Sequence, residues 1–104
     1  MANYLLAYHG GSMPETPEAQ KASMDAWMSW FGGLGEAVVD GGNPSGAART
    51  VAANGVTEGG GANPITGYSV LKADNLDAAV KMAQGCPILT NGGSVQVCET
   101  FDAM

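Results

Sequence analysis

The chain has 104 residues, with 4 Lys or Arg against 10 Asp or Glu and a formal net charge of −6. This length predicts one domain, spanning residues 1–104, built around one hydrophobic core. The negative charge, with no stripe of basic residues to offset it, excludes nucleic acid and anionic membrane surfaces as partners.

The sequence contains no long apolar run and no leader with a basic start and an apolar centre. We therefore expect no membrane span, no signal peptide and a cytoplasmic location. In that reducing compartment the two cysteines, Cys86 and Cys98, are expected to be free thiols, with a disulfide as the less favoured alternative. Neither belongs to a Cys-x-x-Cys pair or a Cys/His cluster, so no metal site is expected.

The first predicted elements are a strand and a long helix. Residues 3–8, NYLLAY, are apolar and aromatic, which predicts a strand buried on both faces for much of its length. Thr16 is a candidate N-cap, followed by Pro17 at the first helical position. The apolar spacing that follows predicts a helix with a broad buried face, closed by the glycines at positions 32, 33 and 35.

The remaining predicted elements alternate between strands and a second helix. They are a strand over 36–42, a hairpin over 48–56, a strand over 66–73, a helix over 76–85 and a strand over 93–101. Asn54-Gly55 is a favoured hairpin turn. Asp74 or Asn75 caps the second helix, and Gly85 ends it. The glycine run 59–61 lacks the context of a phosphate-binding loop and is predicted to be a connector.

This order predicts an α+β fold, the ferredoxin-like βαββαβ arrangement with an extra small hairpin. Two helices cover only one face of such a sheet. The strands nevertheless supply apolar groups to both faces, among them Leu5, Leu6, Val70 and Leu71. We therefore expect the uncovered face to pack against a second copy in a homodimer.

The segments TGYSVLKADNLDAAVKMAQGCPIL and GGSVQVCE resemble the C-terminal half of the YCII-related (DGPF-domain) family, and YLLAY, AWMSW and VDGGNP fit its N-terminal half. The resemblance implies a dimeric α+β barrel, in which two ferredoxin-like subunits pack sheet against sheet. It implies no single activity, because the wider superfamily includes isomerases, monooxygenases and degradative enzymes. The Asp-Gly-Pro-Phe signature is absent, and TEGGGANPITGY stands in its place.

His9, the single histidine, follows the first strand and is a candidate general base. We expect it to point toward the cleft between sheet and first helix, or toward the first loop. Asp40 is its candidate catalytic partner and matches the acidic position that the resemblance implies. The histidine that some family members carry on the first helix has no counterpart here. The alternative is a strand-terminal histidine that is hydrogen-bonded to the backbone.

Trp27 and Trp30 share one face of the first predicted helix and are candidate walls of a pocket for a small planar ligand. The alternative is that the aromatic residues of this helix fill the core. Tyr68, in the glycine-tyrosine strand, is the third candidate ligand-binding residue. Cys86 is disfavoured as a nucleophile because a helix C-terminus raises the pKa of a thiol.

These observations lead to two functional hypotheses of different classes. In the first, the protein binds a small, mostly apolar metabolite in a pocket between sheet and first helix, and whether it also transforms that metabolite is left open. In the second, it is a non-enzymatic structural or regulatory dimer that recognises another protein. No organic or metal cofactor is implied by any motif.

Overall fold

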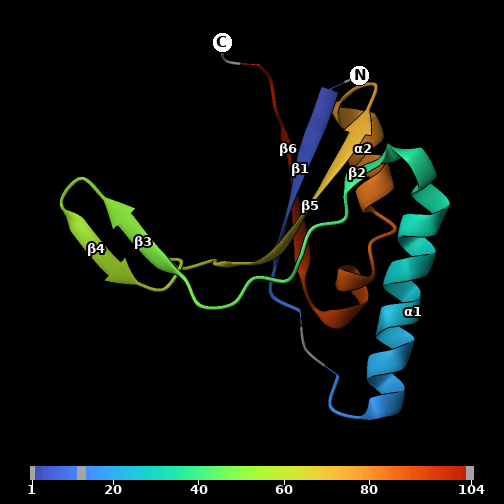
Figure 1. Cartoon of the computed structure of the whole chain (residues 1–104), viewed down its shortest axis with the longest axis horizontal. Helices are drawn as coiled ribbons and strands as arrows, with labels where there is room; N and C mark the ends of the chain where they lie inside the picture. Colours follow the sequence, from blue (N-terminus) through green and yellow to red (C-terminus); the bar gives the residue numbers. More distant parts are fainter. Residues whose placement is uncertain (1, 12–13, 103–104) are drawn as a thin grey trace.

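The computed structural model describes residues 2–11 and 14–102 and shows the predicted alternation of strands and helices (Figure 1). Its strands are β1 (Ala2–His9), β2 (Val38–Asp40), β3 (Arg49–Ala52), β4 (Gly55–Glu58), β5 (Ile65–Ala73) and β6 (Ser94–Glu99). Its helices are α1 (Pro17–Leu34) and α2 (Leu76–Ala83), with short 3-10 helices η1 (Gly35–Ala37) and η2 (Pro87–Asn91).

A four-stranded antiparallel sheet has the strand order β2-β5-β1-β6. The central strand β1 pairs with β5 on one side and with β6 on the other. Both α1 and α2 lie on one side of this sheet, and the β3–β4 hairpin projects away from them (Figure 1). The prediction of a ferredoxin-like α+β fold is therefore confirmed.

The hydrophobic core lies between the helices and one face of the sheet. Alternate residues of β1 enter it, and Leu6 is fully buried there against Leu71 of β5. The helix α2 contributes two small side chains, Ala79 and Ala83, so its axis packs close to the sheet. The other buried members of this core are Tyr4, Tyr8, Ala73, Cys86 and Ile88.

The opposite face of the sheet has no helix over it and is called the open face below. It consists of the other alternate residues of the strands β1, β5 and β6, namely Asn3, Leu5, Ala7, His9, Tyr68, Val70, Lys72, Ser94, Gln96 and Cys98. Leu5 has 37% of its side chain exposed, whereas its neighbour Leu6 has 0%. The prediction that this strand is buried on both faces for much of its length therefore fails at Leu5 within the single chain, whereas Ala7 and His9 on the same face are buried.

Several element boundaries differ from the prediction for local reasons. The strand predicted over 36–42 is shorter because a 3-10 turn over 35–37 precedes β2. Thr16 caps α1 and Asn75 caps α2, each accepting a backbone N–H three residues ahead. The helix α2 ends at Ala83, before Gly85. The predicted broad buried face of α1 is only partly buried, because much of the space beneath that helix is an open cavity.

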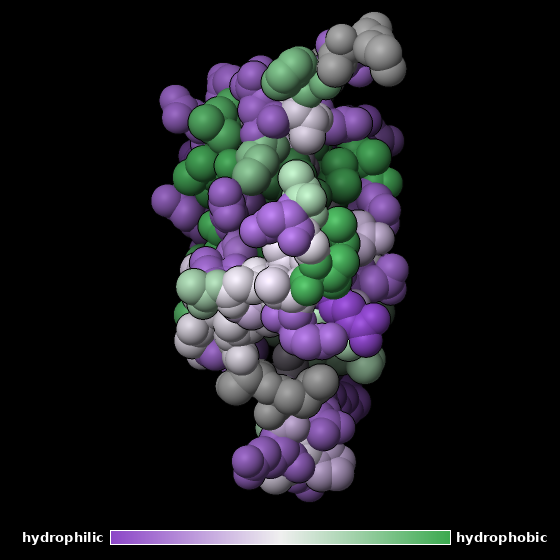
Figure 2. Space-filling view, turned by 90° about the vertical axis from the view of Figure 1, so that its left-hand side faces the viewer, coloured by the Kyte–Doolittle hydropathy of each residue, from purple (hydrophilic) through white to green (hydrophobic). Residues whose placement is uncertain are grey.

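The single chain exposes more surface than a compact chain of its length. Its accessible surface is 7113 Å², whereas a compact monomer of this size exposes about 5,400 Å². Its Cα radius of gyration is 15.0 Å, against about 13 Å for a compact domain. Hydrophobic groups are visible on the side from which the hairpin projects (Figure 2).

Candidate functional site

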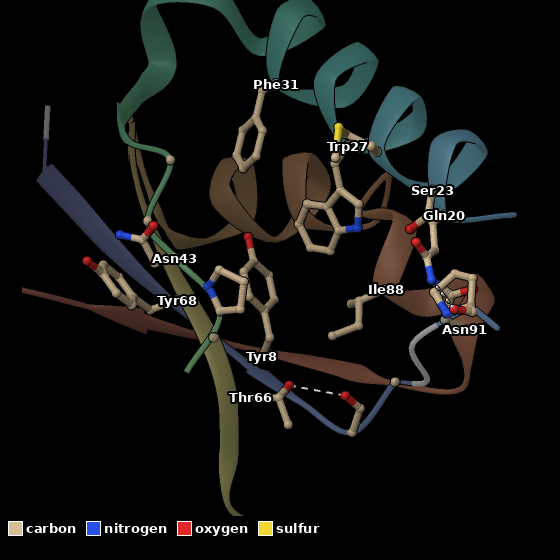
Figure 3. A pocket seen from close by; sticks show the side chains of 18 residues that line it. Tyr8, Gln20, Ser23, Trp27, Phe31, Asn43, Thr66, Tyr68, Ile88 and Asn91 are labelled. Atoms are coloured by element: carbon tan, nitrogen blue, oxygen red, sulfur yellow. Dashed lines mark hydrogen bonds between the residues drawn. The ribbon is translucent and has the colours of Figure 1, made fainter. Parts of the chain in front are cut away.

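A cavity of about 750 Å³ lies between α1 and the covered face of the sheet. One wall is aromatic, since Trp27 and Phe31 of α1 face Tyr8 of β1 (Figure 3). The Tyr8 and Trp27 rings meet edge to face with centroids 5.2 Å apart, and Trp27 and Phe31 are 6.0 Å apart. Contacting rings hold one another in place, so the wall offers a flat apolar surface.

Neutral polar side chains gather at one end of this cavity, where α1 begins. Gln20 and Ser23 of α1 lie there beside Asn91 of η2 (Figure 3). The Gln20 Nε2 amide donates to the Pro14 carbonyl oxygen over 3.1 Å, which holds the side chain near the cavity mouth. The described lining residues include no Asp, Glu, Lys, Arg or His. The cavity can therefore donate and accept hydrogen bonds but offers no full charge to a ligand.

The Tyr8 hydroxyl belongs to a short relay of hydrogen bonds at the cavity wall. It donates to Ser69 Oγ over 2.7 Å, and Ser69 Oγ donates to the Gly41 carbonyl oxygen over 2.7 Å. Burial raises the pKa of the Tyr8 phenol far above its usual value. Tyr8 therefore stays protonated near neutral pH and acts as a fixed wall and hydrogen-bonding group.

The turn after β2 forms another side of the cavity and depends on Gly42. This glycine has φ +73°, and a Cβ built on it would lie 1.7 Å from the Tyr68 carbonyl oxygen. Only a residue without a side chain allows the turn to cross β5 so closely. The Asp40 carboxylate accepts a hydrogen bond from the Gly42 N–H over 2.8 Å, so Asp40 stabilises this turn.

His9 lies on the open face, on the opposite side of the sheet from Tyr8 and the cavity. Its Nδ1 donates to the Pro64 carbonyl oxygen over 3.2 Å, and its Nε2 is 3.4 Å from Gln96 Oε1. Successive residues of a strand point to opposite faces, so Tyr8 takes the cavity side and His9 the other. The expectation that His9 points into the cleft under the first helix is therefore wrong.

Nor does the sheet register bring His9 and Asp40 together. Asp40 pairs with Val70, and Val70 pairs with Leu5, four positions before His9 along β1. Four strand positions correspond to about 13 Å, with a whole strand also lying between the two residues. The two residues of the predicted catalytic pair therefore occupy separate places, one at a turn and one on the open face.

The three predicted ligand-binding residues take different positions. Trp27 lines the cavity. Trp30 does not appear in the described lining, because its ring turns toward α2, where Nε1 donates to the Met82 carbonyl oxygen over 3.0 Å. Tyr68 borders the cavity where Gly42 approaches its backbone, but its ring belongs to the open face and points away from Trp27 (Figure 3).

Sequence reasoning missed most of the lining. A signal was present in α1, where the lining residues recur every three or four positions, at Gln20, Ser23, Met24, Trp27 and Phe31. This spacing places them on one stripe of a helix, and the polar members of that stripe mark its exposed mouth. The remaining lining residues come from turns that the sequence does not align, such as Gly10, Asn43 and Asn91.

Both cysteines are free, as predicted, and neither lines the cavity in the described structure. Burial raises the pKa of the Cys86 thiol to about 11, so this group stays protonated at neutral pH. Among residues 2–11 and 14–102, no three His, Cys, Asp or Glu side chains are close enough to hold a metal ion. Within the same residues, no helix is long and apolar enough to cross a membrane.

Alkaline pH is expected to destabilise the fold through Cys86 and Tyr8. The Cys86 pKa is raised from 9.0 to about 11, so the unfolded chain loses this proton first as the pH rises. The free energy of unfolding is then at its full value below about pH 9 and falls as the pH rises to about 11. Urea denaturation between about pH 9 and 11 measures how steeply the free energy of unfolding falls with pH. Cys86→Ala should make this fall less steep, and an unchanged pH dependence in that variant would contradict the prediction.

Comparisons with known proteins show the fold but no family. No family model matches the sequence, and no curated protein matches it. Among solved structures, the chain is similar to 5-chloro-2-hydroxyhydroquinone dehydrochlorinase from Burkholderia phenoliruptrix AC1100 in complex with 2,5-dihydroxybenzoquinone. The TM-score is 0.57 and the identity 16%, over 96% of this chain and 93% of that one. That enzyme has the dimeric α+β barrel fold, and a likeness at this identity shows the fold alone.

Proposed function

We propose that this protein binds a small, planar, uncharged metabolite in the cavity between α1 and the sheet. The observation that carries this proposal is the aromatic wall combined with neutral polar groups, in a lining whose described residues include no charged side chain. A volume of about 750 Å³ falls within the range of about 300–1,000 Å³ that is usual for small-molecule sites.

The lining favours a ring over a flexible or charged ligand. A ring can pack against Trp27 and Phe31, while a hydroxyl or carbonyl on its edge reaches Gln20, Ser23 or Asn91. A carboxylate or phosphate would lose its hydration in this cavity without gaining a cationic partner from the described lining. The similar dehydrochlorinase, whose structure holds a quinone ring, supports a ring-shaped ligand but not the same reaction.

Binding is the function that the geometry supports best. General acid–base catalysis requires a titratable group within hydrogen-bonding reach of the ligand. The candidate base His9 is on the far side of the sheet, and Asp40 is engaged in the turn with Gly42. The tyrosine in the wall, Tyr8, remains protonated at neutral pH.

The proposal also includes membership of the YCII-related family and a homodimer formed through the open face. The fold and the likeness to a dimeric α+β barrel enzyme support both. The open face offers apolar area at Leu5, which is 37% exposed, and at the half-buried Val70, and its one described charged side chain, Lys72, lies toward one end of it. A chain of net charge −6 can bury such a face against a copy of itself without pairing like charges at the centre.

The two tryptophans provide a direct test of the binding site. Trp27→Phe should weaken binding of a suitable ring compound about tenfold, because the larger indole surface is lost from the wall. Trp30→Phe should leave binding nearly unchanged, since Trp30 is directed toward Met82. Calorimetric titration with hydroquinone and 4-hydroxybenzamide measures both effects, and the Trp27 emission of the Trp30→Phe variant should respond to the ligand.

A matched ligand pair tests the charge preference. 4-Hydroxybenzoate has the shape of 4-hydroxybenzamide but carries a carboxylate, and it should bind at least about tenfold more weakly.

Two results would count against the binding site. Equal losses of ligand affinity in the Trp27→Phe and Trp30→Phe variants would contradict its place beside Trp27. Failure of every neutral ring compound to bind would favour the alternative of a dimer that recognises another protein.

A further inference from the structure

The β3–β4 hairpin, residues 49–58, is an arm that leaves the body of the molecule (Figure 1). Every residue of this arm is exposed. It forms its own two-stranded sheet, separate from the main one. An isolated two-stranded hairpin is at best marginally stable in water, because it buries too little apolar surface. The arm therefore lacks, within one chain, the packing that would keep it folded.

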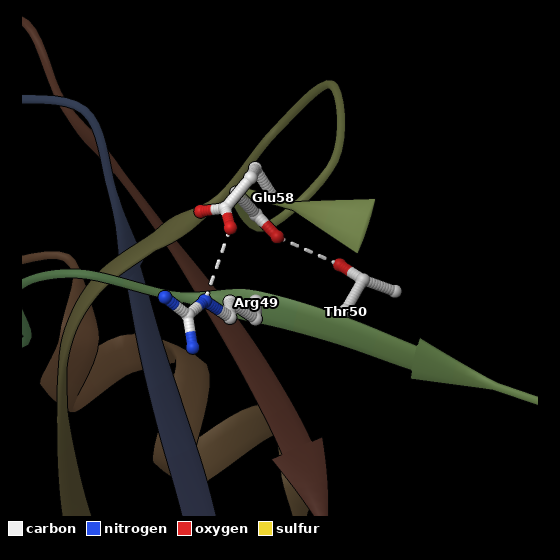
Figure 4. A network of polar contacts seen from close by, with 4 residues as sticks. Arg49, Thr50 and Glu58 are labelled. Atoms are coloured by element: carbon white, nitrogen blue, oxygen red, sulfur yellow. Dashed lines mark hydrogen bonds and ion pairs between the residues drawn. The ribbon is translucent and has the colours of Figure 1, made fainter. Parts of the chain in front are cut away.

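One face of the arm is suited to contact with another surface. Val51 and Val56 lie directly opposite each other, with 78% and 62% of their side chains exposed. The same face carries Arg49 and Glu58, paired at 3.1 Å near the root of the arm (Figure 4). The charges therefore cancel, and the outer half of this face is apolar. An exposed ion pair contributes little stability, so it does not by itself explain the ordered hairpin.

The root of the arm is closed on itself, and the chain that returns from it contacts the open face. The arm begins and ends at one backbone hydrogen bond, from the Gly59 N–H to the Ala48 carbonyl oxygen over 2.9 Å. Beyond it, the Pro64 carbonyl oxygen accepts from His9, which holds the returning chain against the open face. This contact, together with Gln96, accounts for the burial of His9 to 7% exposure. His9 therefore contacts the chain that returns from the arm, at Pro64, and not the arm itself.

The surface area indicates what covers the arm and the open face. The chain exposes 7113 Å², which is roughly 1,700 Å² more than a compact chain of its length. Stable homodimers bury about 2,000–5,000 Å² in total, or about 1,000–2,500 Å² per copy. The excess falls within the range that one copy buries in such a dimer. Because the arm projects from the helix-free side of the sheet, a copy packed on the open face lies alongside it (Figures 1 and 2).

We propose that the β3–β4 arm is a clasp that closes over a second copy of this chain, with Val51 and Val56 buried against that copy. In a symmetric pair each copy extends its arm to the other, so the contact occurs twice. This inference rests on the proposed homodimer but goes beyond it, because packing of the two open faces does not require the arm.

Sedimentation velocity over a range of concentrations tests the clasp. The unaltered chain should sediment as a dimer. Replacing residues 49–58 with Asn-Gly keeps the root closed, since Ala48 and Gly59 are already hydrogen-bonded, and should weaken the dimer at least about a hundredfold. The double variant Val51→Thr, Val56→Thr keeps the shape and β propensity of the arm and should weaken the dimer about tenfold. The matched double variant Val51→Ile, Val56→Ile should keep the dimer.

The outcomes separate the clasp from the dimer itself. A dimer whose dissociation constant is unchanged by removal of the arm would overturn the clasp and leave the open-face dimer standing. A chain that is monomeric at every concentration would overturn both. Limited trypsin digestion gives an independent measure, because Arg49 lies in the arm. Cleavage after Arg49 should be slow at concentrations where the dimer forms and at least about tenfold faster in the Val51→Thr, Val56→Thr variant, as its dimer dissociates.

Discussion

Gly42→Ala is expected to lower the free energy of unfolding by about 3 kcal/mol or more. The added methyl group would stand 1.7 Å from the Tyr68 carbonyl oxygen, which is a backbone atom that no rotamer change can move. The left-handed φ of +73° adds strain for any residue with a side chain. The turn would have to move away from β5, and the Asp40–Gly42 hydrogen bond would be lost with it. Urea denaturation followed by far-UV circular dichroism measures the loss.

The neighbouring glycine offers a matched control. A Cβ on Gly41 would meet no atom within 4 Å, so Gly41→Ala should change the stability by no more than about 0.5 kcal/mol. A Gly42→Ala variant as stable as Gly41→Ala would show that the turn does not cross β5 as described. Because Gly42 also lines the cavity, any Gly42→Ala protein that still folds should have weaker ligand binding.

Leu6→Ala is expected to cost about 3 kcal/mol of unfolding free energy, whereas Leu5→Ala should cost less than about 1 kcal/mol in the separated chain. Leu6 is fully buried in the core between sheet and helices, and removing its side chain leaves a cavity there. Leu5, the next residue, is 37% exposed on the open face and has less packing to lose. Denaturation at a protein concentration low enough to separate the copies measures both values.

The same two variants distinguish the two faces of the sheet at higher concentration. If the open face joins two copies, Leu5→Ala should weaken their association, and its denaturation midpoint should depend on protein concentration. Leu6→Ala should lower the free energy of unfolding at every protein concentration. Equal costs for the two leucines in the separated chain would contradict the assignment of one covered and one open face.

Local signals in the sequence account for most of the secondary structure. Thr16 and Asn75 are caps because their side chains satisfy backbone N–H groups in the first helical turn. The hairpin predicted around Asn54-Gly55 forms, but its turn is Ala53-Asn54, because Gly55 already pairs with Ala52 as the first residue of β4. These interactions join residues a few positions apart, so they can be predicted without knowledge of the fold. The 3-10 helix η2 escaped prediction because it is short and follows Cys86-Pro87 without a periodic pattern.

The candidate site was only partly predictable. The position of a pocket between sheet and first helix, and the presence of Trp27 in its wall, agree with the helical spacing of the aromatic residues. The hydrogen bond between His9 and Pro64 joins residues 55 positions apart and has no trace in the local sequence. The same is true of the Tyr8–Ser69 contact, which joins residues 61 positions apart.

The alternation along NYLLAYH determines that Tyr8 and His9 point to opposite sides of the sheet, whatever the rest of the chain does. It does not determine which side the helices cover, because that depends on how the connections after β1 and β5 return across the sheet. Once both helices pack against Tyr4, Leu6 and Tyr8, the ring of Tyr8 becomes part of the cavity wall. The single histidine is then left on the open face, where it is hydrogen-bonded to Pro64 and lies away from the cavity.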